Sequence, residues 1–159
     1  MILKAIDAIN KWVLTIIAIL FGIMAVIIIF QVFSRFFLGL PLAWSEEIAR
    51  LIMAYTIFLG AAIALRKGRL IAVEFLLEKL PKSKRNIVTI IIQVIAIAFF
   101  ILLFIQGIKM IDQVHSQLSS ALRIPMSVFY AAIPIGSVLL MMNSIAVTIE
   151  ILTEKDDDA

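Results

Sequence analysis

The chain has 159 residues, 64% of them hydrophobic, with a mean hydropathy of +1.15 and a net charge of +3. Because soluble domains are about 45–50% apolar, this composition excludes a soluble globular domain and predicts one all-α integral membrane domain over residues 1–159. The sequence contains no cysteine, which excludes disulfides, thiolate metal sites and a cysteine nucleophile.

The first predicted span covers residues 12–34, an uncharged run that follows Lys11. A helix rises about 1.5 Å per residue and the hydrocarbon core is about 30 Å thick, so roughly 20 residues are needed to cross it. Signal peptides also begin with basic residues, but their apolar region is shorter and a small-residue cleavage site follows promptly. We therefore expect this span to remain in the mature chain.

The second span needs charged residues to reach a sufficient length. The uncharged run 51–65 is too short by itself, and extension to 44–65 gives about 33 Å at the helical rise. The extension includes four residues that we call the charged entrance, namely Trp44, Glu46, Glu47 and Arg50. A charge at the bilayer centre costs about 2.5–3.5 kcal/mol, and much less near the interface, so we expect the charged entrance at headgroup depth.

Two roles of the charged entrance stay open from the residues alone. The first is structural, because Ser45 suits a helix start, carboxylates there complement the helix dipole, and Trp44 suits the interface. Glu46 and Arg50 also have the favourable i, i+4 spacing for an ion pair. The second role is the docking of a partner protein by the charges. Physical chemistry by itself favours the first.

The last two spans are predicted over residues 86–108 and 124–149, after Arg85 and Arg123. The three long runs contain no ionisable residue, whereas transporters place such residues or broken helices near the midplane of the membrane. Pro134 and Gly136 favour a kink in the last span, but the first half of the chain has no matching break, so no inverted repeat is visible. We therefore expect no transport pathway wholly within this chain.

Polar and small residues inside the spans are expected to make helix contacts. Those expected to form hydrogen bonds between helices, rather than to bind ions, are Gln93, Gln106, Ser137 and Asn143. Small residues at packing spacing are Ala18 and Gly22, then Thr56, Gly60 and Ala64, then Ala132 and Gly136. Whether these ridges pack within the chain or against a partner stays open, because apolar sequences often produce such spacings.

The basic residues predict the orientation of the four spans. Ten of the 14 Lys and Arg residues lie at the two termini and in the loop 66–86, and four lie on the opposite side. The positive-inside rule therefore places both termini and this loop in the cytoplasm. The basic residues of the loop are Arg66, Lys67, Arg69, Lys79, Lys82, Lys84 and Arg85.

The same loop contains a short amphipathic pattern over residues 73–80, ending at Pro81. We predict a short interfacial helix there, with Lys82, Lys84 and Arg85 against the anionic headgroups of membrane lipids. A solvated connector is the alternative, since the pattern covers few turns. After the last span, the tail 150–159 ends in the acidic sequence EKDDDA, which is expected to be disordered.

The sequence contains no candidate catalytic, metal or cofactor site. His115 is the only histidine, and one imidazole is insufficient for a bis-histidine haem or a typical zinc site. A Ser/His/Asp arrangement would need an oxyanion loop, and none of the six glycines lies in a phosphate-binding motif. The basic cluster lies beside membrane spans, so it does not indicate nucleic-acid binding. We expect no enzyme activity and no cofactor in this chain.

Four stretches, taken in order, carry a resemblance to a known family. They are PLAWSEEIAR, FLGAAIALRKGRLIAVEFL, LPKSKR and RIPMSVFYAAIPIG. This order on a four-span frame resembles the small membrane subunit of tripartite ATP-independent periplasmic (TRAP) transporters, the DctQ-like proteins, over nearly the whole chain. Its most specific part is the charged entrance, followed by Gly60 and a basic loop. Many relatives have His-Ile-x-Val-Asp where this chain has residues 70–74, LIAVE, so no role of that histidine is expected here.

The resemblance implies a scaffold that anchors a large multi-span subunit in the bacterial inner membrane. That subunit would carry the sodium and substrate sites, and a soluble periplasmic binding protein would deliver an organic acid such as a dicarboxylate, another carboxylate or a sialic acid. Because the sequence contains no fused large subunit, we expect that subunit to be a separate chain. The charged entrance would then hold the large subunit or lie near the docked binding protein.

Two alternatives belong to other functional classes. A self-contained small transporter or channel, acting as a homo-oligomer, would need an ionisable lining, for which only Glu46, Glu47 and Arg50 are candidates. A membrane-bound redox or hydrolytic subunit would have only His115 for its chemistry. The missing site chemistry favours the scaffold over both.

Overall fold

The computed structural model describes residues 2–40, 42–67 and 82–157, and most of them are helical. The elements are α1 (Ile2–Phe33), the π-helical turn η1 (Ser34–Leu38), α2 (Ala43–Arg66), α4 (Lys82–Val114), α5 (Met126–Tyr130) and α6 (Ala132–Asp157). Within these ranges four segments are long and apolar enough to cross a membrane, namely Leu3–Leu38, Ala43–Arg66, Ile87–Val114 and Met126–Thr153. The prediction of an all-α protein with four spans is confirmed.

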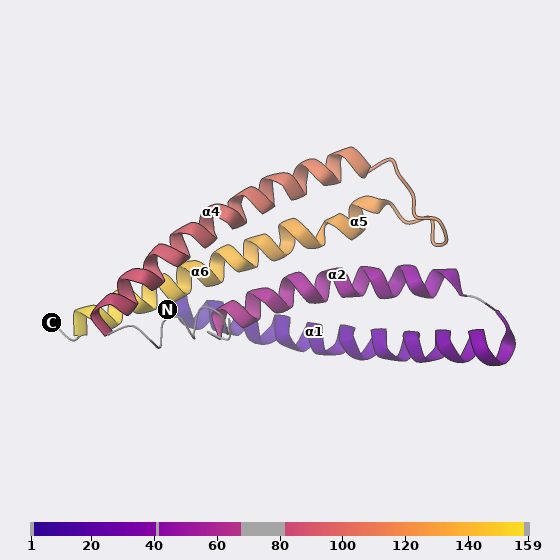
Figure 1. The fold of residues 1–159 in the computed structure, drawn as a ribbon, viewed down its shortest axis with the longest axis horizontal. Coiled ribbons are helices and arrows are strands. Elements are labelled where there is room, and N and C mark those ends of the chain that lie inside the picture. The colour runs from indigo at the N-terminus through magenta and orange to yellow at the C-terminus, as the bar shows by residue number, and fades with distance from the viewer. Residues whose placement is uncertain (1, 41, 68–81, 158–159) are drawn as a thin grey trace.

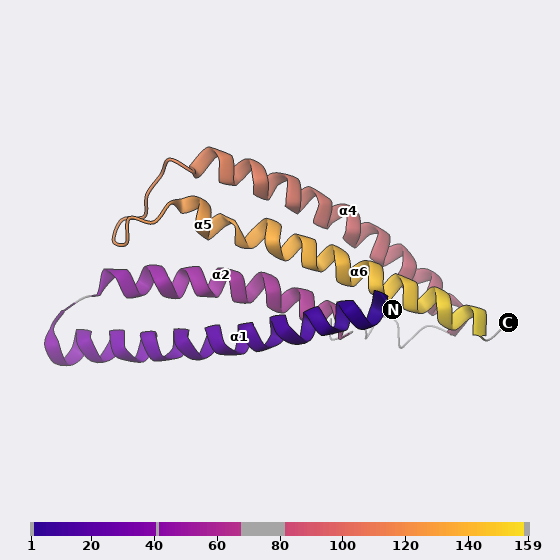
Figure 2. The same cartoon turned by 180° about the vertical axis from the view of Figure 1, so that it is seen from behind.

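The long helices lie side by side in an open row in the order α1, α2, α6, α4 (Figure 1). α2 packs between α1 and α6, and α6 packs between α2 and α4. The described parts of α1 and α4 do not touch each other, and the view from behind shows the same order (Figure 2). In the most apolar stretch of the first span, 0% of the residues are buried within the chain, whereas 39% are buried in the corresponding stretch of the fourth span. The row therefore leaves its end helices open to lipid or to another protein.

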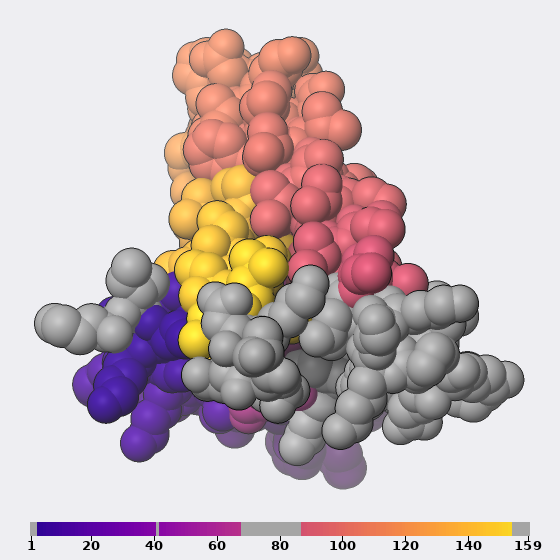
Figure 3. Space-filling view, turned by 90° about the vertical axis from the view of Figure 1, so that its left-hand side faces the viewer, coloured from indigo at the N-terminus to yellow at the C-terminus, as the bar shows by residue number. Residues whose placement is uncertain are grey.

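The beginning of α1 and the end of α6 lie at the same end of the row, which we call the terminal end (Figure 1). The connection from α1 to α2 and the loop 115–125 lie at the opposite end, which we call the distal end. Seen from the terminal end, α6 lies between α1 and α4 (Figure 3). This arrangement agrees with an even number of spans, and the placement of the terminal end in the cytoplasm stays a prediction.

The helices extend beyond the predicted spans. α1 begins at Ile2 rather than at residue 12, and α4 runs from Lys82 to Val114 rather than from 86 to 108. The predicted ends were set by charged residues, but a helix continues past the hydrocarbon because its hydrogen bonds lie within the segment and charged side chains can extend to the interface. The second span agrees best with its prediction: α2 covers Ala43–Arg66, and the predicted range was 44–65.

Two predictions for the terminal end have different outcomes. The interfacial helix predicted over residues 73–80 lies outside the described residues. The acidic tail was expected to be disordered, but α6 continues as a helix to Asp157, so that prediction is wrong up to this residue. Glu and Lys in this stretch are good helix formers, and they extend the last turns of an existing helix.

The last span is interrupted between α5 and α6. Ala131 separates the two helices, and Pro134 follows three residues later. Pro134 has no N–H, so the carbonyl of Tyr130 loses its usual helical hydrogen bond at this point. The helix is therefore interrupted close to Pro134, where a kink was predicted, and the interruption lies toward the distal end of the span.

Two glycines bring α6 into close contact with its neighbours. A Cβ atom added at Gly136 would lie 2.5 Å from the Cβ atom of Phe58 on α2, and one added at Gly107 on α4 would lie 2.8 Å from the Cδ atom of Pro134. Small residues at these positions let the helices approach closely without a side chain between them. The predicted ridge at Gly136 therefore packs within this chain. The buried core cluster comprises Ala62 and Leu65 on α2, Phe100 on α4, and Leu139 and Leu140 on α6.

The connection from α1 to α2 is a tight reversal at the distal end. η1 ends at Leu38 and is capped by Gly39, whose φ of 66° is left-handed, a conformation that costs glycine less than other residues. The hydroxyl of Ser34 donates to the carbonyl oxygen of Leu40 at 3.0 Å. This turn sets α2 beside α1 and places the charged entrance at the distal end.

Candidate functional site

The charged entrance occupies the first two turns of α2, as the sequence predicts. α2 begins at Ala43, and the hydroxyl of Ser45 donates to the carbonyl oxygen of Leu42 at 2.7 Å. Trp44 is 39% exposed, in agreement with an interfacial position. Ser45 therefore lies inside the first turn and does not cap the free N–H groups of the helix start, for which Leu42 is the N-cap residue without a side-chain bond.

Glu46 and Arg50 do not form the expected ion pair. Glu46 instead accepts a hydrogen bond from Nε2 of Gln31 on α1, at 3.2 Å. Among the described residues, the ion pairs all involve Arg66, and Arg50 is exposed. The i, i+4 spacing allowed a pair within α2, but the neighbouring α1 supplies Glu46 with another partner.

Glu47 connects α2 to the loop 115–125. Its carboxylate accepts hydrogen bonds from the backbone N–H groups of Ala121 at 2.8 Å and Leu122 at 2.9 Å. Hydrogen bonds to an ionised acceptor are about twice as strong as neutral ones. Arg123, next in the loop, has a φ of 57°, which is uncommon for a residue other than glycine. Glu47 therefore holds a strained loop in place.

The loop held by Glu47 is also closed on itself. The N–H of Ser119 donates to the carbonyl of Ile124 at 2.8 Å, and the N–H of Met126 donates to the carbonyl of Gln117 at 2.8 Å. Between α2 and this loop lies a pocket of about 190 Å³ lined by Glu47, Arg50, Gln117, Ser119 and Phe129, among others. The structure thus brings Glu47, Arg50 and the loop together and directs Glu46 to α1.

The described residues contain no cluster of metal-ligating side chains. His115 is exposed, and its Nδ1 lies 2.6 Å from the backbone carbonyl oxygen of Asp112, one turn earlier. Such a contact completes the end of α4 and gives the histidine a local structural partner.

Gly60 lies in the second half of α2, and no close contact within the described chain requires a glycine there. A Cβ atom added there would meet no other atom within 4 Å, and the same holds for Gly22 on α1. Gly22 and Gly60 therefore leave room for an added side chain, unlike Gly136, although Gly60 itself is half-buried. They are positions at which another helix could approach closely.

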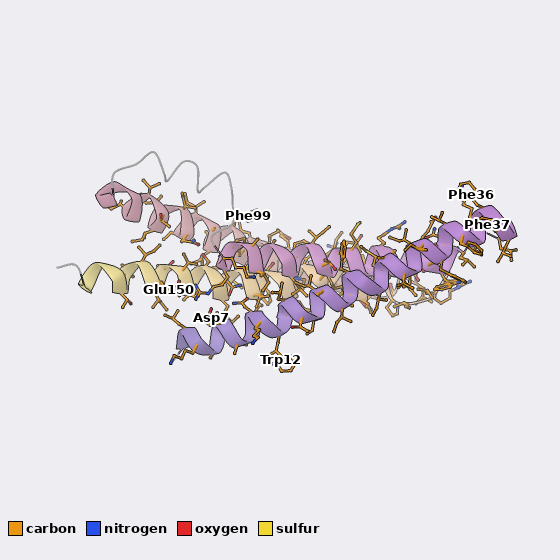
Figure 4. The ribbon with its side chains drawn as sticks, turned by 90° about the horizontal axis from the view of Figure 1, so that it is seen from below. Asp7, Trp12, Phe36, Phe37, Phe99 and Glu150 are labelled. Atoms are coloured by element: carbon orange, nitrogen blue, oxygen red, sulfur yellow. The ribbon has the colours of Figure 1, made fainter. Side chains whose placement is uncertain are left out.

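At the terminal end, Arg66 joins three helices. Its guanidinium pairs with both carboxylate oxygens of Glu150 on α6, each at 2.6 Å, and with Asp7 on α1 at 2.9 Å. Asp7 and Glu150 stand on facing helices, while Trp12 projects away from them (Figure 4). Arg66 was predicted as part of a basic interfacial loop, and its carboxylate partners were missed, because only the fold brings residues so far apart together.

The other basic residues predicted at this end are placed as follows. Lys67 is exposed just after α2, with its N–H bonded to the carbonyl of Ile63 at 3.1 Å. Lys82, Lys84 and Arg85 lie in the first turn of α4, and Arg69 lies outside the described residues. Contact with lipid headgroups stays a prediction for these residues.

Polar side chains inside the spans also connect the helices, in addition to the ion pairs of Arg66 at the terminal end. The amides of Asn10 and Asn143 exchange hydrogen bonds of 2.6 and 2.9 Å, and Asn143 also donates to the carbonyl of Ala62 at 2.8 Å. The hydroxyl of Ser144 donates to Oε1 of Gln93. The predicted interhelical roles of Asn143 and Gln93 are confirmed.

The two other predicted bridging residues do not connect helices. Ser137 donates to the carbonyl of Ile133 in its own helix at 2.7 Å. Gln106 is exposed on α4. A hydroxyl can bond to the preceding turn of its own helix, so a polar residue in a span does not need a partner helix.

Comparison with known proteins matches most of the chain to one family. The family described as tripartite ATP-independent periplasmic transporters, DctQ component, matches residues 24–154. The chain is 29% identical over 155 residues to the sialic acid TRAP transporter permease protein SiaT of Haemophilus influenzae, covering 96% of this chain and 24% of that protein. It is 27% identical over 124 residues to the sialic acid TRAP transporter small permease protein SiaQ of Vibrio cholerae, covering 75% of this chain and 69% of SiaQ.

A third relative is the ectoine TRAP transporter small permease protein TeaB of Halomonas elongata. It is 27% identical over 136 residues, covering 84% of this chain and 70% of TeaB. The chain therefore spans about a quarter of the length of SiaT but most of the length of the proteins named as small permeases.

Proposed function

The chain belongs to the DctQ component family of TRAP transporters, and it is a multi-pass transport component rather than an enzyme. We propose that it scaffolds and anchors a large permease subunit in the bacterial inner membrane. SiaT and the isethionate TRAP transporter permease protein DctMQ of Oleidesulfovibrio alaskensis are longer permeases in which this chain matches 24% and 21% of the length. A large partner region joined to a DctQ-like region supports a large partner for this chain.

The observation that carries the proposal is the position and bonding of the polar groups. Within the described spans, the charged side chains lie toward helix ends, as at Arg66 and Glu47. The buried amides of Asn10, Asn143 and Gln93 bond to other groups of this chain. A transport pathway needs ionisable or unsatisfied polar groups near the midplane, so a partner is expected to supply it.

The open row provides surfaces for such a partner. α1 contacts α2 and a short part of α6, and its exposed residues include Trp12, Val26 and Ile29. Gly22 and Gly60 add places where a foreign helix would meet no side chain of this chain. We assign these faces to the large subunit.

The charged entrance has divided roles in this proposal. Trp44 and Arg50 are exposed and available for contact with the large subunit or with the docked binding protein. Glu47 positions the loop 115–125 beside them, and Glu46 links α2 to α1. This assignment places the distal end in the periplasm, following the positive-inside rule.

The substrate is proposed to be an organic acid, such as a dicarboxylate, another carboxylate or a sialic acid. It would be taken up with sodium by the large subunit and delivered by a soluble periplasmic binding protein. Relatives are named for sialic acid, ectoine and isethionate. Because these names differ while the small-subunit frame is shared, the other components are expected to determine which acid is bound.

Affinity purification of the tagged chain from native membranes in mild detergent tests the proposal. We expect one large, very apolar membrane protein to co-elute in equal amount. Replacement of Gly60 by leucine should reduce that recovery while the isolated chain keeps its thermal stability, because the position leaves room for an added side chain. Recovery of the chain alone, as a discrete oligomer that moves solute in liposomes, would favour a self-contained transporter instead.

A further inference from the structure

The terminal end contains a pocket that the scaffold role does not require. It has a volume of about 410 Å³ and lies between α1 and the last turn of α2. This volume is within the range of about 300–1,000 Å³ that is common for small-molecule sites. Its lining combines charged, amide and apolar side chains, namely Asp7, Asn10, Lys11, Leu14, Ile63, Arg66 and Lys67.

Of the charged side chains in the pocket, Arg66 and Asp7 form ion pairs, whereas the two lysines form none within the described part of the chain. Arg66 is held by Asp7 and Glu150, and its side chain is only 12% exposed. Lys11 and Lys67 are exposed, one on each wall, and neither forms an ion pair with a described residue. Their ammonium groups are therefore the pocket's candidates for binding an external anion.

The depth of the pocket indicates which anion it suits. Lys11 directly precedes the uncharged run 12–34, and Lys67 directly follows the second span. We therefore expect both lysines at the level where hydrocarbon meets headgroups. Leu14 and Ile63 give the same pocket an apolar part. A soluble anion would use only the lysines, whereas a phospholipid would use both the lysines and the apolar part.

We propose that this pocket binds the phosphate headgroup of an anionic glycerophospholipid between Lys11 and Lys67, with the first carbons of an acyl chain against Leu14. Basic pockets between membrane helices are established sites for anionic headgroups in other proteins. The ion pairs of Arg66 fix the walls of the pocket, since they tie α1 and α2 to α6. The proposal is independent of the transport partner and is tested on the chain alone.

The test measures binding to the purified, delipidated full chain in detergent. Phosphatidylglycerol, phosphatidylcholine and soluble glycerol 3-phosphate are titrated separately, and binding is followed by native mass spectrometry and by thermal stabilisation. We expect phosphatidylglycerol to bind and to raise Tm, with little effect of the other two compounds. Lys11→Gln/Lys67→Gln should weaken phosphatidylglycerol binding on the order of 30-fold, because each lysine near an anionic headgroup contributes about a factor of five.

Two further double variants make the outcome specific. Lys4→Gln/Lys109→Gln removes the same charge outside the pocket and should change the affinity less than about twofold. Lys11→Arg/Lys67→Arg keeps the charge and should restore binding, which also controls for folding. Equal weakening in both glutamine variants, or no weakening in the pocket variant, would overturn the proposal. A response to glycerol 3-phosphate equal to that of the lipid would overturn the assignment to a membrane lipid.

Discussion

The guanidinium of Arg66 at the end of α2 binds both carboxylate oxygens of Glu150 on α6, with two N···O distances of 2.6 Å. Asp7 on α1 approaches the same guanidinium at 2.9 Å. Three of the four long helices are thus joined at one arginine, although the row has few contacts between α1 and α6 otherwise. This ion-pair cluster fixes the terminal end of the protein.

Glu150→Gln should destabilise the isolated chain by about 1–2 kcal/mol, the range of a hydrogen bond to a charged group at a partly exposed site. The replacement removes the carboxylate that accepts two hydrogen bonds from Arg66, and it leaves Asp7 as the remaining charged partner of Arg66. Unfolding in mixed micelles measures the effect. Asp112→Asn, which removes an exposed carboxylate outside the cluster, is the control and should change stability by less than about 0.5 kcal/mol. Equal stability of both variants would refute a structural role of the Glu150 contact.

The interhelical amide pair gives a prediction about coupling between two residues. Asn143 is fully buried and bonds to Asn10 and to the carbonyl of Ala62. Asn143→Leu should cost about 1–2 kcal/mol, because it leaves the buried amide of Asn10 without its partner. The double replacement with Asn10→Leu should cost less than the sum of the two single changes.

A double-mutant cycle of unfolding free energies measures this coupling, and about 0.5–1.5 kcal/mol is expected. Ser137→Ala is the control, since that hydroxyl bonds only to its own helix at Ile133. Additive effects of the Asn10 and Asn143 changes would contradict the importance of the pair.

The spans were predictable because an uncharged apolar run of roughly 20 residues is typical of a membrane-crossing helix, whereas the helix ends were not predictable. Charged residues such as Lys11 and Lys109 lie within α1 and α4, so a charge marks the edge of the hydrocarbon rather than the end of the helix. Spacing within α2 predicted an ion pair between Glu46 and Arg50, but Glu46 instead accepts a hydrogen bond from Gln31 on α1. Local spacing indicates possible partners, and only the packing decides among them.

The partners of the charged groups in long-range contacts could not be identified from the sequence. Glu47 meets Ala121 and Leu122, and Arg66 meets Asp7 and Glu150. The sequence does offer one general hint, that acidic residues near the ends of the first and last spans share a side with a basic loop. It does not identify which residues pair, because that depends on the order of the helices in the row.

Gly136→Ala should loosen the contact between α2 and α6. The added Cβ atom would lie 2.5 Å from that of Phe58, so the helices must separate, at a cost of about 1–3 kcal/mol. Gly22→Ala adds the same methyl group where no atom lies within 4 Å and should be neutral or slightly stabilising, since alanine favours helices. Thermal unfolding of the two variants is the measurement. A neutral Gly136→Ala would mean that α2 and α6 are less closely packed.

Glu47→Lys should release the loop 115–125 from α2. The change removes the acceptor of the Ala121 and Leu122 amides and places a cation beside their donors. We expect the hydrogen exchange of these two amides to accelerate measurably, since both lose a charged acceptor and the loop opens more often. Exchange followed by mass spectrometry of the isolated chain reports this directly.

Glu46→Lys is the matched control for this prediction, because it reverses the adjacent charge but affects only the bond to Gln31. Its loop amides should exchange as in the unmodified chain. If the loop positions the partner-binding surface, Glu47→Lys should also reduce co-purification of the large subunit, or uptake, more than Glu46→Lys does. Faster exchange with normal co-purification and uptake would leave Glu47 as a structural residue only, and equal exchange in the two variants would disprove its hold on the loop.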